Sequence, residues 1–199
     1  PSRGLGDVYK RQTYREGWCG FFNLPREVVL CEDSTLKFVP IRELEQLRRD
    51  VQSEETCIVE DKNSFSLKDG AVYELKMKIN LKETTAKVIR MDLRCSGERK
   101  TVIKFDLNKG EISFDRNQSD GWSKGIAKSP INLMRKDILD IHIFSDQSSI
   151  ELFSNDYKNN ISCDVFTDDE EQKNSILAER GRIYSVSYTH LRAHETDSY

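Results

Sequence analysis

The sequence predicts an all-β protein that folds as an antiparallel two-sheet β-sandwich. From residue 71 onward, apolar and polar residues alternate with a period of two, which is typical of strands that bury one face and expose the other. Short polar turns interrupt these runs at regular intervals. Many short strands with one-sided burial favour an antiparallel sandwich over a parallel sheet covered by helices.

The residues before this region predict a strand, a kink, a second strand and a short helix. The aromatic and apolar run 18–30 is interrupted by Pro25 and by a charged pair that follows it. A helix can begin at Pro40, and its apolar residues recur at three-residue spacing: Ile41, Leu44 and Leu47. The polar stretch 50–55 has neither a period nor enough apolar residues to fold, so it predicts a boundary between two parts of the chain.

The alternating region predicts a series of hairpins. Its first strand places six apolar residues on the buried face: Ala71, Tyr73, Leu75, Met77, Ile79 and Leu81. The opposite face is predicted to be wet and carries Glu74, Lys76, Lys78 and Asn80. Further strands are predicted around 89–93, 103–107, 112–114, 139–145, 149–154 and 161–165, with polar turns between them.

Composition and charge argue against two kinds of partner. The 199 residues include 31 Lys and Arg against 34 Asp and Glu, and the cations form no basic stripe, so the sequence predicts no nucleic-acid partner. No apolar run approaches the roughly 18 residues that a membrane-spanning helix needs. The sequence therefore predicts no membrane partner either.

Five cysteines are spread along the chain: Cys19, Cys31, Cys57, Cys95 and Cys163. They form no CxxC pair and have no neighbouring histidine, so the sequence predicts neither a metal site nor a disulfide framework, and no cofactor. Unpatterned thiols are typical of a reducing interior, which favours a cytoplasmic location over a secreted one and otherwise leaves the compartment open.

Both ends of the chain resemble translated sequencing-adapter DNA. Residues 186–196 (VSYTHLRAHET) read as the translation of a transposase adapter, and residues 2–12 (SRGLGDVYKRQ) read as the translation of its reverse complement. Because unrelated protein ends would not be reverse complements of each other, we predict that residues 1–12 and 186–199 are adapter-derived artefacts. This interpretation removes two pairs that resemble ligand motifs: His190 with His194, and Gly4 with Gly6.

Several blocks of the sequence resemble motifs of glycoside hydrolase family 32, in the family's order. Residues 18–20 (WCG) and 24–27 (LPRE) resemble the WxG and LPRE motifs that close the family's propeller, and 40–48 resembles its PVxELxxLR motif. Residues 114–119 (FDRNQS) resemble FDRxxS, and 141–155 resembles the hairpin motif LHIFxDxSSxExFxN. The departures lie in loops: Gln147 stands where arginine is common, Tyr157 and Lys158 replace a usual glycine turn, and Thr167 replaces a frequent proline.

The resemblance implies the end of a five-bladed catalytic β-propeller followed by a lectin-like C-terminal β-sandwich. On this basis residues 13–39 are predicted as the end of the propeller, 40–56 as a linker with a short helix, and 57–185 as the sandwich. The implied partner is the missing N-terminal propeller of the same chain, with a carbohydrate substrate bound through that module. Homo-oligomerisation is left open.

The implied activity is hydrolysis of β-fructofuranosidic bonds in sucrose, sucrose-6-phosphate or fructans, which requires two carboxylates. The family's catalytic carboxylates belong to motifs resembling NDPNG, RDP and EC, and none of these occurs between Thr13 and Ser185. We therefore predict no catalytic residue in this chain, assign no substrate-binding residue, and expect the chain alone to be inactive on sucrose. The alternative is a free-standing carbohydrate-binding sandwich, which would have no use for the LPRE block.

Several conspicuous residues have a structural interpretation that outweighs a catalytic one. Asp115 and Arg116 are expected to form an ion pair at a turn rather than to contact sugar. His142, a lone histidine on a strand, is expected to be a packed or surface side chain. Glu151 lies opposite the apolar side chains of its strand and could meet the catalytic module, contact another subunit or be solvated. The remaining expectations are a blade-closing Trp18, an exposed Trp122 and a solvated acidic loop at 168–171.

The apolar run near the N-terminus also predicts the behaviour of the chain in solution. If these residues are propeller core, the fragment exposes them to water. The sequence therefore predicts that deleting residues 1–38 raises the solubility of the sandwich.

Overall fold

The structure is a computed structural model that describes residues 21–193, except 55, 62, 121–123 and 168–171. Its described residues form fifteen β-strands and one short 3₁₀ helix, η1 (Arg42–Leu47). The strands are β1 (Arg26–Leu30), β2 (Leu36–Pro40), β3 (Arg48–Glu54), β4 (Cys57–Val59), β5 (Ser64–Leu67), β6 (Tyr73–Asn80), β7 (Val88–Ser96), β8 (Arg99–Asp106), β9 (Glu111–Gln118), β10 (Ile126–Pro130), β11 (Ile138–Asp146), β12 (Ser149–Ser154), β13 (Asn159–Asp164), β14 (Lys173–Glu179) and β15 (Ile183–Ala193).

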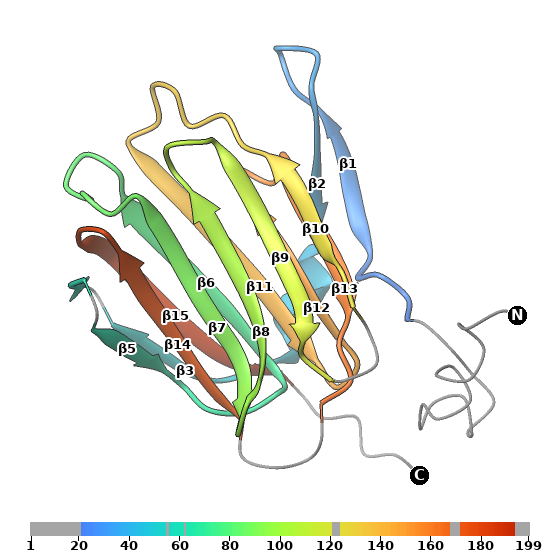
Figure 1. The fold of residues 1–199 in the computed structure, drawn as a ribbon. Helices are drawn as coiled ribbons and strands as arrows, with labels where there is room; N and C mark the ends of the chain where they lie inside the picture. Colours follow the sequence, from blue (N-terminus) through green and yellow to red (C-terminus); the bar gives the residue numbers. More distant parts are fainter. Residues whose placement is uncertain (1–20, 55, 62, 121–123, 168–171, 194–199) are drawn as a thin grey trace, which may run out of the picture.

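Strands β3 to β15 form two antiparallel sheets that pack face to face (Figure 1). The first has six strands in the order β10-β9-β8-β7-β14-β5. The second has seven strands in the order β13-β12-β11-β6-β15-β3, with β4 paired to β15. The predicted hairpins are present as β7–β8, β8–β9, β11–β12 and β12–β13. This arrangement confirms the predicted antiparallel sandwich.

The hydrophobic core lies between the two sheets. It contains the residues that the period-two alternation places on one face, such as Leu75 and Ile79 of β6 and Met91 of β7, all of which are fully buried. Removing these side chains from water is the main force that holds the sheets together.

One end of the core is polar and is organised around Arg94, which is fully buried at a bulge in β7. Arg94 has a positive φ of 52°. Its guanidinium donates to the Ser145 hydroxyl and to the backbone carbonyl oxygens of Ala71, Asp146, Gln147, Ser149 and Val165. Burial lowers the pKa of Arg94 to about 10, so the side chain stays charged near neutral pH. This single side chain therefore joins the ends of several strands and loops.

The N-terminal part of the described chain lies beside the sandwich rather than within it. Strands β1 and β2 form a separate two-stranded sheet, which Figure 1 shows next to β10 and β13. The predicted short helix is present as η1, and none of its residues is fully buried. Residues 21–25 form no strand, so the strand predicted before Pro25 is not found in this part of the described chain.

The polar stretch 50–55 was expected to lie outside regular structure, and this expectation is wrong for residues 50–54. They belong to β3, which pairs with β15 at one edge of the seven-stranded sheet. An edge strand is held by backbone hydrogen bonds to one neighbour and needs no buried apolar face. The composition of the stretch could not reveal this pairing.

The last strand, β15, includes residues 186–193, which the sequence indicates to be adapter-derived. The strand lies between β6 and β3, where His190 is buried and its ring is stacked 4.9 Å from that of Tyr73. His190 thus lies in a strand and not in a zinc-binding helix, while His194 is outside the described residues. Residues 1–12 are also outside them, and the adapter origin of 1–12 and 186–199 stays a prediction. In the described part of the chain, no helix is long and apolar enough to span a bilayer.

Candidate functional site

The N-terminal segment 22–48 packs against part of the outer face of the seven-stranded sheet. Strand β12 shows this most clearly, because all six of its residues are buried although its side chains alternate between two faces. Ile150 and Leu152 point into the core, while Glu151 and Phe153 point outward. The outward side chains are buried because the N-terminal segment lies over them.

Glu151 anchors the beginning of this segment. Its side chain is 2% exposed and forms an ion pair with Arg26 of β1. The backbone N–H of Leu24 donates to Glu151 Oε1 at 2.7 Å, and the Ser162 hydroxyl donates to Oε2 at 3.0 Å. The Arg26 guanidinium also lies 4.8 Å from the ring centre of Phe153, a cation–π contact. Both oxygens of this carboxylate are therefore occupied by donors.

Glu74 anchors the end of the segment in the same way. Arg48, the first residue of β3, donates from Nε and Nη2 to the two carboxylate oxygens of Glu74, each at 2.7 Å. His142 Nε2 lies 2.8 Å from Glu74 Oε1, and His142 Nδ1 lies 3.2 Å from the hydroxyl of Tyr157. A neutral imidazole satisfies both contacts if Nε2 donates to Glu74 and Nδ1 accepts from Tyr157.

Burial and hydrogen bonding set the charges in this cluster. Burial alone would raise the pKa of Glu74, but the hydrogen bonds from His142 and Arg48 outweigh it and hold the value at about 2. Burial lowers the pKa of His142 below its ordinary value of 6.5, although Glu74 opposes this shift. Glu74 is thus a carboxylate and His142 a neutral ring near pH 7. A carboxylate held in this state cannot serve as the general acid of a glycosidase.

Aromatic rings fill the space between the two anchors. His142 lies 4.4 Å from Phe144 and 5.9 Å from Tyr157, measured between ring centres, and Phe153 contacts the same three rings at 6.0 to 6.2 Å. Together the two glutamates and these rings form a mixed apolar and charged surface. We call this surface, made by Glu74, His142, Phe144, Glu151, Phe153 and Tyr157, the outer-face site.

The structure tests several residues that the sequence singled out. His142 is a packed side chain, as expected. Glu151 is not solvated but contacts the segment predicted as the end of the propeller. The expected ion pair between Asp115 and Arg116 is wrong, because the Arg116 guanidinium reaches across to Asp164 on β13 while Asp115 accepts the backbone N–H of Asn117. Neighbours in a strand point to opposite faces, which prevents the first pairing.

Other residues that the sequence singled out lie outside the described part of the chain or form no ligand site there. Trp18, Cys19, Trp122 and the acidic loop 168–171 lie outside the described residues. Among the described residues, no group of three or more His, Cys, Asp or Glu side chains could hold a metal ion. The described cysteines are free thiols.

Sequence reasoning missed Glu74 and Arg48 as partners. Glu74 was predicted to face water, but it is only 3% exposed. The alternation correctly placed it opposite the core, yet alternation cannot reveal that another segment covers that side.

Comparison with known proteins agrees with this geometry. The sequence model of the family described as "Glycosyl hydrolases family 32 C terminal" matches residues 43–195. A sucrose-6-phosphate hydrolase from Zymomonas mobilis is 31% identical over 182 residues, which cover 88% of this chain and 35% of the relative. A levanase from Bacillus sp. is 27% identical over 183 residues, covering 86% of this chain and 20% of that protein.

Solved structures show the same fold. The fructan 1-exohydrolase IIa of Cichorium intybus matches with a TM-score of 0.79 at 12% identity, covering 93% of this chain and 43% of that chain. The sucrose-6-phosphate hydrolase of Lactobacillus gasseri matches with a TM-score of 0.69 at 19% identity, covering 93% and 36%. The chain spans about a third of the length of the sucrose-6-phosphate hydrolase relatives that it matches.

Proposed function

Since the chain belongs to the C-terminal domain family of the family 32 glycosyl hydrolases, we propose that it is the non-catalytic C-terminal module of a longer enzyme. We further propose that this enzyme hydrolyses β-fructofuranosidic bonds in sucrose, sucrose-6-phosphate or fructans. The module would support the catalytic β-propeller that precedes it. The names of the relatives, which include sucrose-6-phosphate hydrolases and levanases, support this range of substrates.

One observation carries the proposal. The segment 22–48, which we assign to the end of a propeller and its linker, is fixed to the sandwich at both ends by an arginine bound to a buried glutamate. Removing either arginine would leave a buried carboxylate without its main partner, which is strongly unfavourable. Such anchors couple the sandwich to the polypeptide that precedes it, which supports a module that packs against a preceding domain.

The exposed residues of the hairpin support the same assignment. Phe22, Val28, Leu30 and Leu36 are large apolar side chains exposed to solvent. Val28 pairs with Phe38 and Leu30 with Leu36 across the hairpin, so their side chains share one face. A group of exposed apolar side chains on one strand face is typical of a surface that another part of the protein buries.

The decisive measurement is long-read sequencing of the source DNA across this locus. We expect the upstream reading frame to continue into a propeller that contains the family's Asp and Glu motifs. Full-length protein should then release fructose from sucrose or sucrose-6-phosphate, and the 199-residue chain should release none. A start codon just before Trp18, or fructose release by the chain alone, would refute the proposal. Saturable binding of levan or inulin by the chain alone would favour the free-standing sugar-binding module.

A further inference from the structure

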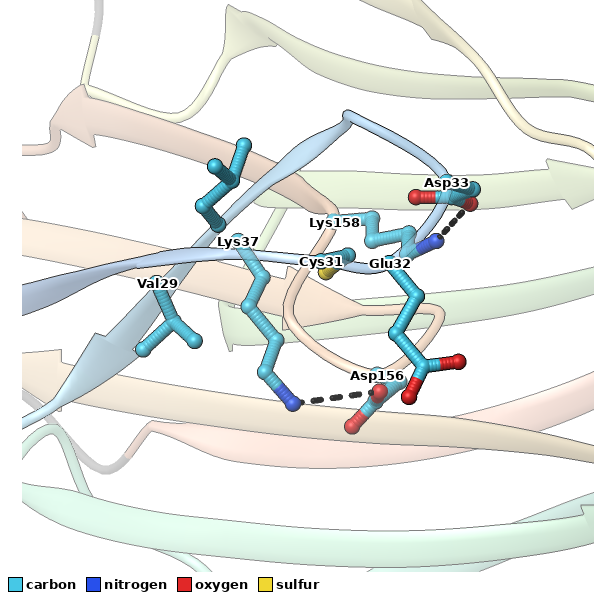
Figure 2. Close-up of a pocket in the computed structure, with 8 residues that line it drawn as sticks. Val29, Cys31, Glu32, Asp33, Lys37, Asp156 and Lys158 are labelled. Carbon is cyan, nitrogen blue, oxygen red and sulfur yellow. Dashed lines mark hydrogen bonds and ion pairs between the residues drawn. The ribbon is translucent and has the colours of Figure 1, made fainter.

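Two turns face each other where the hairpin meets the sandwich. The first joins β1 to β2 and contains Cys31 and Asp33, and the second joins β12 to β13 through residues 155–158. Figure 2 shows a shallow hollow lined by residues of both turns and of β1 and β2. Contacts across this hollow add to those of Arg26 in holding the hairpin on the sandwich.

The charges on the two sides are reciprocal. Lys37 of the hairpin reaches Asp156 of the second turn, with 3.3 Å between Nζ and Oδ2. Asp33 of the hairpin accepts from Lys158 of the second turn, with 2.6 Å between Oδ2 and Nζ. Figure 2 shows both pairs as dashed lines. In these two pairs each side supplies one acid and one lysine, and the pairs run in opposite directions; Glu32 of the hairpin also lines the hollow.

The second turn has an unusual backbone that presents these charges. Asn155, Asp156 and Tyr157 have φ values of 54°, 54° and 62°, so three successive residues that are not glycine adopt the left-handed conformation. Such residues are costly and persist only where their surroundings hold them. The carboxylate of Asp140 accepts the N–H of Asp156 at 3.0 Å.

Tyr157 connects this turn to the β1–β2 hairpin and to the outer-face site. Its carbonyl oxygen accepts the backbone N–H of Phe38 from the hairpin at 3.1 Å. Its hydroxyl contacts His142 of the outer-face site at 3.2 Å. A glycine at this position would relieve the backbone but would provide no ring and no hydroxyl. The turn is therefore built around its contact with the hairpin.

We propose that the two turns form a charge-matched lock that favours one orientation of the β1–β2 hairpin on the sandwich. The lock rests on the proposed function only in that the hairpin would carry the preceding module with it. An orientation that exchanged the partners would place Lys37 against Lys158 and Asp33 against Asp156.

The lock acts through the difference in energy between two orientations of the hairpin. The side chains of Asp33 and Asp156 are each 56% exposed, and exposed ion pairs stabilise a fold only weakly. In the exchanged orientation the same charges would repel each other, so the difference between the two orientations is about twice the attraction of the native pairs. This penalty exists only because each side carries one acid and one lysine. If one side carried both acids and the other both lysines, the exchanged orientation would still pair opposite charges.

Charge reversal with hydrogen–deuterium exchange tests the lock in the 199-residue chain. Lys37→Glu and Asp156→Lys each place like charges opposite each other, and the double variant restores an opposite pair. Exchange at the Phe38 amide should be about three- to tenfold faster in each single variant, in line with the weak energy of exposed pairs. In the double variant it should return to within about twofold of the parent chain.

A matched control separates the lock from a general effect of charge. Lys128→Glu disrupts a similar exposed pair with Glu111, 2.8 Å away, between β9 and β10. It should leave exchange in the hairpin unchanged. The lock is refuted if single reversals at positions 37 and 156 have no effect, or if the double variant exchanges as fast as the singles. Because these measurements need no propeller, the lock and the proposed function can fail separately.

Discussion

Glu74 and Glu151 lie on different strands but have the same kind of surroundings. Each is buried on the outer face of the seven-stranded sheet, and each binds an arginine from the segment that covers that face. Because a buried carboxylate is tolerated only when it is paired and hydrogen-bonded, these two residues make the sandwich depend on its N-terminal cover. Each carboxylate therefore has a structural role, which is to hold the N-terminal segment on the sheet.

The buried histidine beside Glu74 predicts a pH dependence of stability. The pKa of His142 is below its ordinary value of 6.5 in the folded chain, so the unfolded chain binds more protons below that pH. The free energy of unfolding should therefore fall as pH is lowered from 7 toward 5. His142→Gln can keep both hydrogen bonds without titrating, and it should flatten this slope in urea denaturation at pH 7, 6 and 5.

The parent chain and the His142→Gln variant share all their other titrating groups. A difference between their slopes of unfolding free energy against pH is therefore due to His142. Glu74 acts in a separate window, because its pKa of about 2 lies below the ordinary 4.5. Its contribution is present above pH 4.5 and is lost only as pH falls toward 2. Identical slopes in the parent and His142→Gln chains between pH 5 and 7 would show that the ring is not held neutral.

At the scale of elements, Arg94 connects the ends of several strands. It replaces water as the donor for five backbone carbonyl groups. Arg94→Met would leave those groups without that donor, and we expect a loss of at least about 3 kcal/mol in the free energy of unfolding. Lys82→Met is the control, because Lys82 and its partner Asp137 are both largely exposed. The control should lose less than about 1 kcal/mol. Equal losses in urea denaturation would contradict the role assigned to Arg94.

At the scale of the whole molecule, the structure gives the predicted deletion of residues 1–38 two opposite effects. The deletion would remove the exposed Phe22, Val28, Leu30 and Leu36, in keeping with the predicted rise in solubility. The same deletion would remove Arg26, which covers Glu151 and Phe153. We now expect the truncated sandwich to bind the hydrophobic dye ANS more strongly and to unfold at a lower temperature than the full chain.

A smaller change separates the effect of removing exposed apolar surface from the effect of removing Arg26. Val28→Thr with Leu30→Thr reduces the exposed apolar surface while Arg26 and the charge pairs of the hairpin remain. This double variant should be more soluble than the parent chain at an unchanged unfolding temperature. Truncation that raised solubility without increasing dye binding would show that the outer face needs no cover.

The sequence by itself determined the β-structure and its two faces. Alternation at Leu75, Met77 and Ile79 requires one buried side, because a strand repeats every two residues. The motif blocks also indicated the family, which the match over residues 43–195 shows. Alternation says only which side of a sheet a residue occupies, however, and not what lies on that side.

Only the tertiary structure decided the candidate site, because its contacts join residues far apart in the chain. Arg26 meets Glu151, and Arg48 meets Glu74, only after the sheet has formed and the N-terminal segment has packed across it. The same holds for the edge strand β3, whose polar residues pair with the last strand of the chain. Whether a charged side chain is buried depends on the segment that packs over it, and local periodicity does not identify that segment.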